Sequence, residues 1–175
     1  MRYRRGYLAE VHRDADQAYL QARIDGPGRV PTLFELPRDW WPDSWFNDGA
    51  KRQDPRYVRH LVLLRSALYG HPEAGFLWDD KFTGILVVLG WRTIDAWCGV
   101  FVHTDGSIII LYVDDVMLAA SMENAYKHSR LIEQKVDFKE EAKPLLRYLG
   151  AQYRCEEYNP QLPRSVRRLS VSIAD

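Results

Sequence analysis

Two adjacent aspartates stand between two apolar runs in the stretch Ser107-Ile-Ile-Ile-Leu-Tyr-Val-Asp114-Asp115-Val-Met-Leu-Ala-Ala120. The β-branched content and short length of residues 108–113 are typical of a buried strand rather than a helix. Residues 116–120 are predicted to form the returning strand. Residues 113–116 then make the turn of a β-hairpin, with both carboxylates at its tip.

Two carboxylates at the tip of an apolar hairpin are costly to bury unless positive charge lies beside them. Mg²⁺ is the usual partner, because it takes oxygen ligands from one or two carboxylates and from substrate phosphates. The alternative is a solvated turn, since aspartate side chains often bond nearby backbone amides. The apolar flanks favour the cation site, because solvated turns seldom separate two runs this apolar.

Length and composition indicate one globular domain with a sizeable core, since the chain has 175 residues, 46% of them hydrophobic and 27% charged. The net charge is zero, so nothing attracts the whole chain to nucleic acid. Any contact with a polyanion has to come from local patches. Two arginine clusters are either such patches or solvated termini. They are Arg2, Arg4 and Arg5, and Arg164, Arg167 and Arg168.

The two cysteines, Cys98 and Cys155, lack metal-binding spacing and are too few for a disulfide framework. We therefore expect a reducing, intracellular compartment. No apolar run has the length of a membrane span, and residues 1–11 lack the apolar segment of a signal peptide.

A third aspartate, Asp14, follows a strand predicted at residues 7–12. If a helix starts near residue 15, the Asp14 carboxylate lies at one edge of a sheet. The first helical amides then lie beside it, where phosphates bind well. The alternative is that Asp14 only caps this helix.

The remaining elements are read from periodicity and turn residues. Pro72 and Glu73 suit the first turn of a helix that Gly90 ends. Asp105 and Gly106 mark a hairpin turn, after a strand whose last residue, His103, is expected to be structural. Strands are predicted at residues 32–37, 57–64 and 98–103, and a second helix at residues 123–136.

Four aromatic residues lie among Pro, Asp and Asn between residues 38 and 54. They either stack on single-stranded bases or pin an irregular loop onto the core through their large buried area. They are Trp40, Trp41, Trp45 and Phe46.

Three motifs resemble those of reverse transcriptases. Tyr-Val-Asp-Asp at residues 112–115, between two hydrophobic strands, resembles motif C. Asp-x-x-x-Ala-Tyr, beginning at Asp14, resembles motif A. Ala-Leu-Tyr-Gly at residues 67–70, with Ala74 and Trp78, is similar to motif B of the Ty1/copia family, although residues 71–73 replace its Leu-Lys-Gln. The motifs occur in the family's order.

The resemblance implies an α+β polymerase palm over residues 7–153, in which helices back an antiparallel sheet with a catalytic hairpin. Residues 154–175 are left as an unassigned polar tail. It also implies RNA-directed DNA synthesis, with two Mg²⁺ ions (or Mn²⁺ in their place) serving nucleotidyl transfer from a dNTP to a primer 3′-hydroxyl. An RNA or DNA template-primer is then the partner.

The family's site residues carry over as follows. Asp14, Asp114 and Asp115 are the implied catalytic and metal-binding carboxylates, joined by the carbonyl of Ala15. The implied nucleotide-binding residues are Asp16, Gln17, Ala18, Tyr19 and Gly70, with Tyr19 as the gate against a ribose 2′-hydroxyl. Residues 145–153 resemble the family's Tyr/Phe-Leu-Gly-Ile strand. The implied template and primer contacts are Tyr112, Val113, Leu149 and Gly150. Lys139 is either the protonating lysine of motif D or an exposed charge.

Only thirteen residues precede Asp14, whereas the family has a long fingers segment there. We therefore expect a fragment of a retrovirus-related Pol polyprotein, with fingers, thumb, RNase H and integrase parts outside it. Two alternatives stay open. One is a Pol remnant without polymerase activity, and the other is a structural or RNA-binding module whose aspartates hold no catalytic metal.

Overall fold

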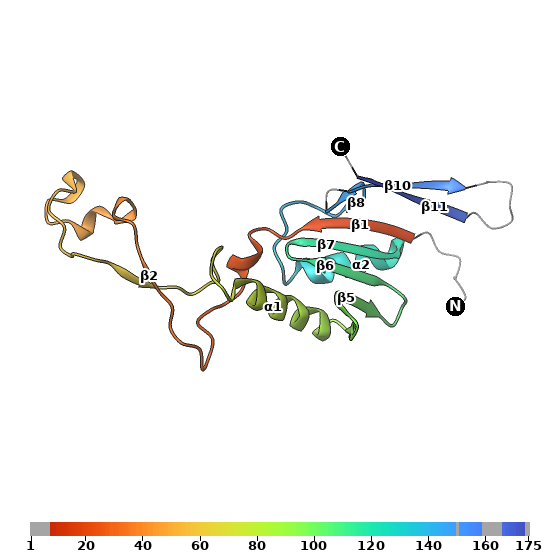
Figure 1. The fold of residues 1–175 in the computed structure, drawn as a ribbon, viewed down its shortest axis with the longest axis horizontal. Helices are drawn as coiled ribbons and strands as arrows, with labels where there is room; N and C mark the ends of the chain where they lie inside the picture. Colours follow the sequence, from red (N-terminus) through yellow and green to blue (C-terminus); the bar gives the residue numbers. More distant parts are fainter. Residues whose placement is uncertain (1–7, 150, 159–165, 174–175) are drawn as a thin grey trace. The chain divides into compact units, whose positions relative to one another are not determined.

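A computed structural model describes residues 8–149, 151–158 and 166–173. The chain divides into two compact units (Figure 1), Tyr19–Leu77 and the remainder, which joins the N-terminal residues up to Ala18 to the chain from Trp78 onward. Helices and antiparallel strands share the larger unit, so the architecture is α+β. Among the described residues, no helix has both the length and the apolar character needed to cross a membrane.

The larger unit is built on a six-stranded sheet in the order β4-β5-β6-β7-β1-β8, and all five neighbouring pairs are antiparallel. The first strand in sequence therefore lies inside the sheet, between β7 and β8. The strands are β1 (Leu8–Asp14), β4 (Trp91–Ile94), β5 (Trp97–His103), β6 (Ile108–Tyr112), β7 (Asp115–Ser121) and β8 (Lys143–Pro144).

The predicted hairpin is present, but its turn lies one residue earlier than expected. β6 and β7 pair from Ile108 opposite Ala119 to Tyr112 opposite Asp115. Asp115 is thus a strand residue, and Val113 and Asp114 make the turn between the strands. Val113 adopts a φ of 54°, in the left-handed region that a two-residue hairpin turn requires.

One face of the sheet is buried and the other is partly open. Along β7, Val116, Leu118 and Ala120 are buried, while the residues between them are only half-buried. Residues 108–113 were expected to form a buried strand, yet Ile108 and Tyr112 of β6 are exposed. An antiparallel sheet tolerates this, because only one of its faces has to be covered.

The helix α2 (Met122–Glu133) packs on β1 and β7. Ser121 caps its start, because the side chain accepts a hydrogen bond of 3.3 Å from the amide of Asn124. The buried side of the helix carries Ala125, His128, Ser129 and Ile132.

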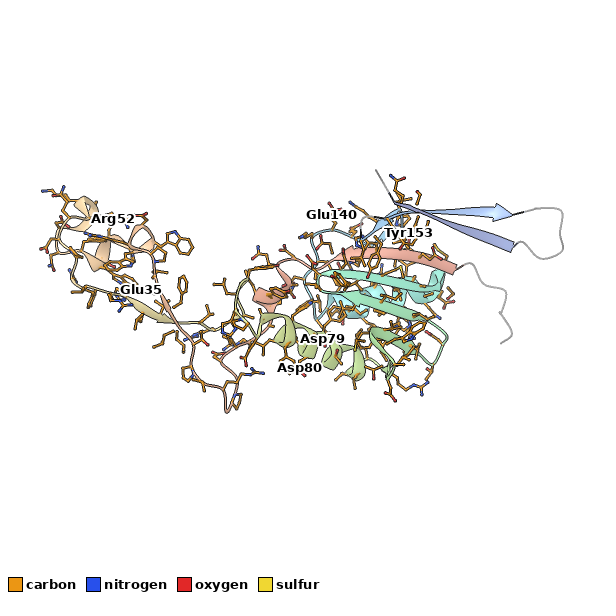
Figure 2. All side chains as sticks on the ribbon, viewed as in Figure 1. Glu35, Arg52, Asp79, Asp80, Glu140 and Tyr153 are labelled. Atoms are coloured by element: carbon orange, nitrogen blue, oxygen red, sulfur yellow. The ribbon has the colours of Figure 1, made fainter. Side chains whose placement is uncertain are left out.

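The helix predicted before Gly90 is α1 (Ala74–Val88). Trp78, Phe82 and Leu86 repeat every four residues and are almost fully buried. The exposed side of the helix carries Asp79 and Asp80 (Figure 2). Gly90 follows the last turn with a φ of 91°, as expected of a residue that ends a helix.

The smaller unit contains β2 (Leu33–Glu35) and β3 (Leu61–Leu63), which pair over three residues. The strand expected at residues 57–64 is therefore much shorter than predicted. Between β2 and β3 lie three 3₁₀ turns, Arg38–Trp40, Asp43–Trp45 and Gly49–Lys51. Trp41 and Phe46 are buried within this segment, while Trp40 is 70% exposed. Trp45 is half-buried and stacks on His60, with 3.4 Å between ring centroids. Packing within the smaller unit thus explains these aromatics except Trp40.

The strand expected at residues 145–153 is divided into β9 (Arg147–Tyr148) and β10 (Ala151–Tyr158). Leu149 separates them with a φ of 47°, a value that no strand accommodates. β10 pairs along its whole length with β11 (Val166–Ile173). Most of this hairpin lies in residues 154–175, where no element was predicted.

Candidate active site

The ends of three strands bring the aspartates of residues 14, 114 and 115 to one end of the sheet. Asp14, the last residue of β1, lies directly opposite Asp115, the first residue of β7. Asp114 occupies the turn just before Asp115, and its carbonyl accepts a hydrogen bond of 2.8 Å from the amide of Ala15. Residues far apart in sequence are therefore fixed side by side by the register of two central strands.

The hairpin turn is anchored by α1. The indole nitrogen Nε1 of Trp78 donates a hydrogen bond of 2.6 Å to the carbonyl of Val113. The Trp78 side chain is almost fully buried and packs on Phe82, with 5.4 Å between the ring centroids. The same tryptophan belongs to the motif B resemblance, and it is the residue of that stretch that bonds to the turn.

Replacing Trp78 with Phe keeps an aromatic ring but removes the donor to the turn. We expect the free energy of unfolding to fall by about 2 kcal/mol, from the lost hydrogen bond and the smaller ring. Chemical denaturation measures it. The matched change Trp97→Phe, at a side chain 65% exposed on β5, is expected to cost less than about 0.5 kcal/mol. An equal loss of unfolding free energy in the two variants would contradict an anchoring role for Trp78.

The two oxygens of Asp14 differ in their surroundings. Oδ2 accepts a hydrogen bond of 2.9 Å from Nζ of Lys139, and the backbone amide of Lys139 donates to the Asp14 carbonyl at 3.0 Å. Oδ1 is buried and has no hydrogen-bond partner among the described residues. A buried carboxylate oxygen without a donor is costly unless a cation occupies the position beside it.

The pKa of Lys139 is affected by the negative charge at this end of the sheet. Its hydrogen bond to Asp14 raises the pKa of the Lys139 ammonium, and the charges of Asp14, Asp114 and Asp16 add to the effect, against a smaller opposing effect of burial. The ammonium is therefore held in its charged form beside three carboxylates.

Asp115 is held by a histidine on the neighbouring strand. Nε2 of His12 lies 2.8 Å from Oδ1 of Asp115. The His12 ring meets Tyr148 edge-on, with 5.9 Å between ring centroids. Burial, followed by the charge of Asp115, raises the pKa of Tyr148 to about 12. The hydroxyl of Tyr148 thus stays protonated beside the carboxylate at neutral pH.

The donor set fits a hard divalent cation, since it consists of carboxylate oxygens and one of them is buried without a donor. The carboxylates are nevertheless turned toward protein partners, Lys139 for Asp14 and His12 for Asp115. Among the described residues, the one group of three metal-ligating side chains that already converges lies elsewhere, at the other end of β6.

The prediction of a helix near residue 15 is wrong. The chain after β1 makes only a four-residue 3₁₀ turn, Ala18–Gln21. The amide of Asp16, expected to face a nucleotide, donates instead to the carbonyl of Asp137 at 2.9 Å. Gln17 adopts a φ of 44°, which interrupts helical geometry. A phosphate site built on a helix N-terminus at Asp16, Gln17 and Ala18 is therefore absent from this conformation.

Tyr19 and Gly70 belong to the smaller unit. The ring of Tyr19 packs on Tyr69, with 4.7 Å between centroids. Gly70 has a φ of 90°, and a Cβ there would meet no atom within 4 Å. The glycine is thus required by backbone conformation rather than by close approach. Ala67 is fully buried, and its amide donates to the carbonyl of Ala22 at 2.8 Å.

The residues predicted to contact template and primer lie at the surface. Tyr112, Val113 and Leu149 are 58%, 40% and 53% exposed. Exposed apolar side chains beside a carboxylate cluster are available to a ligand. Gly150 lies outside the described residues.

Sequence reasoning overlooked His12 as a partner of the aspartates. A signal was available, because residues two apart in a strand share a face, which places His12 beside Asp14. Lys139 was left open between two readings, and the structure pairs it with Asp14. No local pattern pointed to Arg13, which is buried on the opposite face of β1.

A family model described as "Reverse transcriptase (RNA-dependent DNA polymerase)" matches residues 49–159, more than half of the chain. The matched range includes Gly70, Asp114 and Asp115, and it begins after Asp14. A search of curated proteins finds no match to this chain.

Proposed function

The chain belongs to the reverse transcriptase family, and we propose that its six-stranded sheet is the palm of a Ty1/copia-type RNA-directed DNA polymerase. The palm spans residues 7–153 in this proposal. The observation that carries it is the register that sets Asp14 opposite Asp115, beside the turn that holds Asp114. A solvated turn gives no reason for a carboxylate from a distant strand to lie beside it, whereas carboxylate oxygens are the ligands that divalent cations such as Mg²⁺ take.

The three aspartates would hold two Mg²⁺ ions, or Mn²⁺ in their place, with the Ala15 carbonyl as a further ligand. When bound, these ions supply charge neutralisation at the transferred phosphate and at the primer 3′-hydroxyl. The buried Oδ1 of Asp14 is the oxygen most in need of such a partner. His12 and Trp78 act as positioning residues, because they hold Asp115 and the turn carbonyl of Val113.

Lys139 has two compatible roles in this proposal. Before substrate binds, its ammonium balances the charge of Asp14 across 2.9 Å. When a cation takes that place, the hydrogen bond that raises the pKa of Lys139 is lost. The freed Nζ is still an ammonium at neutral pH, as an ordinary lysine is, and it would be free to give a proton to the leaving pyrophosphate.

The ligands of the site follow from this chemistry. A template-primer of RNA or DNA lies over the open face of the sheet, where Ile108 and Tyr112 are exposed. Base selection comes from pairing with the template. The other parts of a Pol polyprotein, including fingers, thumb, RNase H and integrase, are the proposed protein partners.

Primer extension on an RNA template tests the proposal directly. The chain is assayed with Mg²⁺ or Mn²⁺ beside an Asp114→Asn variant of equal fold by circular dichroism. We expect dNTP incorporation that falls at least about 1,000-fold in the variant, as is usual when a metal-binding carboxylate is lost. A folded chain that binds Mn²⁺ and extends nothing would indicate an incomplete enzyme. Absence of both binding and extension would leave family descent without the activity.

A Lys139→Met variant tests whether the ammonium competes with the cation. We expect Mn²⁺ to bind about 10-fold more tightly, because one unit of positive charge leaves the site. Isothermal titration calorimetry gives the affinity. The matched change Lys127→Met, on the exposed side of α2, is expected to alter it less than about twofold. Weaker binding in Lys139→Met would show that the lysine supports the cation site instead.

A further inference from the structure

A second polar cluster, His103, Asp105 and His128, lies at the other end of β6 from the aspartates. His103 is the last residue of β5, Asp105 follows it in the turn that leads into β6, and His128 projects from α2. The five residues of β6 separate this turn from the Val113-Asp114 turn, a length of about 17 Å. The His-Asp-His cluster is thus distinct from the carboxylate site.

The ligand atoms of the His-Asp-His cluster converge. Nδ1 of His103 lies 3.0 Å from Oδ1 of Asp105, and Nε2 of His128 lies 2.7 Å from Oδ2. All three ligand atoms lie within 4.8 Å of one another. A tetrahedral ion with metal–ligand distances of about 2.0–2.1 Å places its ligand atoms about 3.3 Å apart. Small side-chain adjustments therefore bring these atoms into range.

The surroundings hold the three side chains in place. The His128 side chain is only 2% exposed, and the Asp105 side chain is 24% exposed. The buried ring of Trp91 lies beside both histidines, with centroid distances of 5.2 Å to His103 and 4.8 Å to His128. The amide of Ser107 donates to Oδ1 of Asp105 at 2.9 Å. The cluster is therefore partly buried and opens to solvent on the side of Asp105.

The backbone at Gly90 also adapts to the His-Asp-His cluster. A Cβ at this position would lie 3.3 Å from Nε2 of His103. Glycine therefore lets the chain approach the outer nitrogen of the imidazole closely. The ring is confined between Trp91 and this backbone, with Nδ1 directed to Asp105.

We propose that His103, Asp105 and His128 form a binding site for a transition-metal ion of the Zn²⁺ type. Two imidazole nitrogens and one carboxylate oxygen, with the open side left for water, match the three-ligand sets of zinc sites. Mg²⁺ disfavours such a site, because it prefers oxygen ligands alone. The bound ion ties the β5–β6 turn to α2 and stabilises the sheet at the end remote from the aspartates.

The competing explanation is a hydrogen-bonded cluster that needs no ion. Burial by itself raises the pKa of Asp105, but hydrogen bonds from His128, Ser107 and His103 outweigh it and hold that pKa well below its usual range. The carboxylate is therefore ionised, as both explanations require. Only metal affinity distinguishes them.

Zinc titration of the full chain in competition with the chelating dye 4-(2-pyridylazo)resorcinol tests the site. The titration uses an Asp114→Asn background, so that the carboxylate site does not contribute its own affinity. We expect one Zn²⁺ per chain, and binding at least about 100-fold weaker after His103→Gln or Asp105→Asn. The matched change His71→Gln, at a histidine of the smaller unit, is expected to leave affinity within about twofold.

Co²⁺ provides a measurement that needs no ligand-site variant. The chain with Asp114→Asn alone should show the intense visible bands of four-coordinate Co²⁺, and excess Zn²⁺ should remove them. Thermal unfolding should shift upward by about 5 °C in saturating Zn²⁺. A folded chain that binds no Zn²⁺, shows no Co²⁺ bands, or binds equally well after His103→Gln would overturn the proposal.

Discussion

An Asp14→Asn variant is expected to bind Mn²⁺ at least about 100-fold more weakly than the parent chain, a loss of about 2.7 kcal/mol. The substitution keeps the size of the side chain and its place opposite Asp115. It removes one of the charges that a divalent cation requires and replaces the buried Oδ1 with a neutral group. Calorimetric titration measures the change without any need for polymerase activity.

The lysine next to Asp14 gives an independent check on the same variant. Because the hydrogen bond to Asp14 is the largest cause of the raised pKa of Lys139, that pKa should move back toward its ordinary value in Asp14→Asn. A pH titration followed by nuclear magnetic resonance of the Lys139 side chain measures this pKa. The ion pair is exposed, so the free energy of unfolding should change little.

The control for Asp14→Asn is Asp80→Asn, at an exposed position on α1 (Figure 2). It removes the same charge from the chain at a position outside the carboxylate site. We expect Mn²⁺ affinity within about twofold of the parent. Equal losses in both variants would mean that overall charge, and not a defined site, governs the binding.

An Arg13→Met variant is expected to lower the free energy of unfolding by about 3 kcal/mol. Arg13 is 7% exposed on the buried face of β1. Its guanidinium donates to Oγ of Ser129 at 3.1 Å and to Glu133 at 3.0 Å, and it lies 4.0 Å from the ring centroid of Phe138. Methionine fills much of the volume but leaves these groups without their partner.

Chemical denaturation of Arg13→Met measures this loss of unfolding free energy. The matched change Arg92→Met lies on the exposed side of β4, and we expect it to cost less than about 0.5 kcal/mol. A cost below about 1 kcal/mol for Arg13→Met would show that apolar packing replaces the polar network, as it does for some buried ion pairs.

The hairpin of residues 108–121 and helix α1 were predictable because their signals are local. Apolar runs, the Asp105-Gly106 turn and the residues that end helices act within a few positions. The pairing of Asp14 with Asp115 is a long-range contact, and only the resemblance to known motifs pointed to it. Composition and periodicity alone placed Asp14 at the edge of a sheet without naming its partner.

The wrong predictions also have a physical explanation. The helix near residue 15 was inferred from the small and aromatic residues that follow Asp14, but the amides of Ala15 and Asp16 bond to Asp114 and Asp137 from distant segments. Tertiary hydrogen bonds thus override a local preference. The meeting of His103 with Asp105 and His128 was not predicted, because these residues come together only through a turn and a helix that pack together.

The position of β1 inside the sheet has a consequence for how the protein folds. His12 and its partner Asp115 are 103 residues apart in sequence, so β1 has no neighbour until β7 has been made. At about 5–20 residues per second, synthesis leaves it unpaired for about 5–20 s. Closing so long a loop is slow, and the aspartates come together only when β1 docks. The same event joins β1 to the sheet and assembles the site, so a chain that ends before residue 121 would lack both the docked strand and the site.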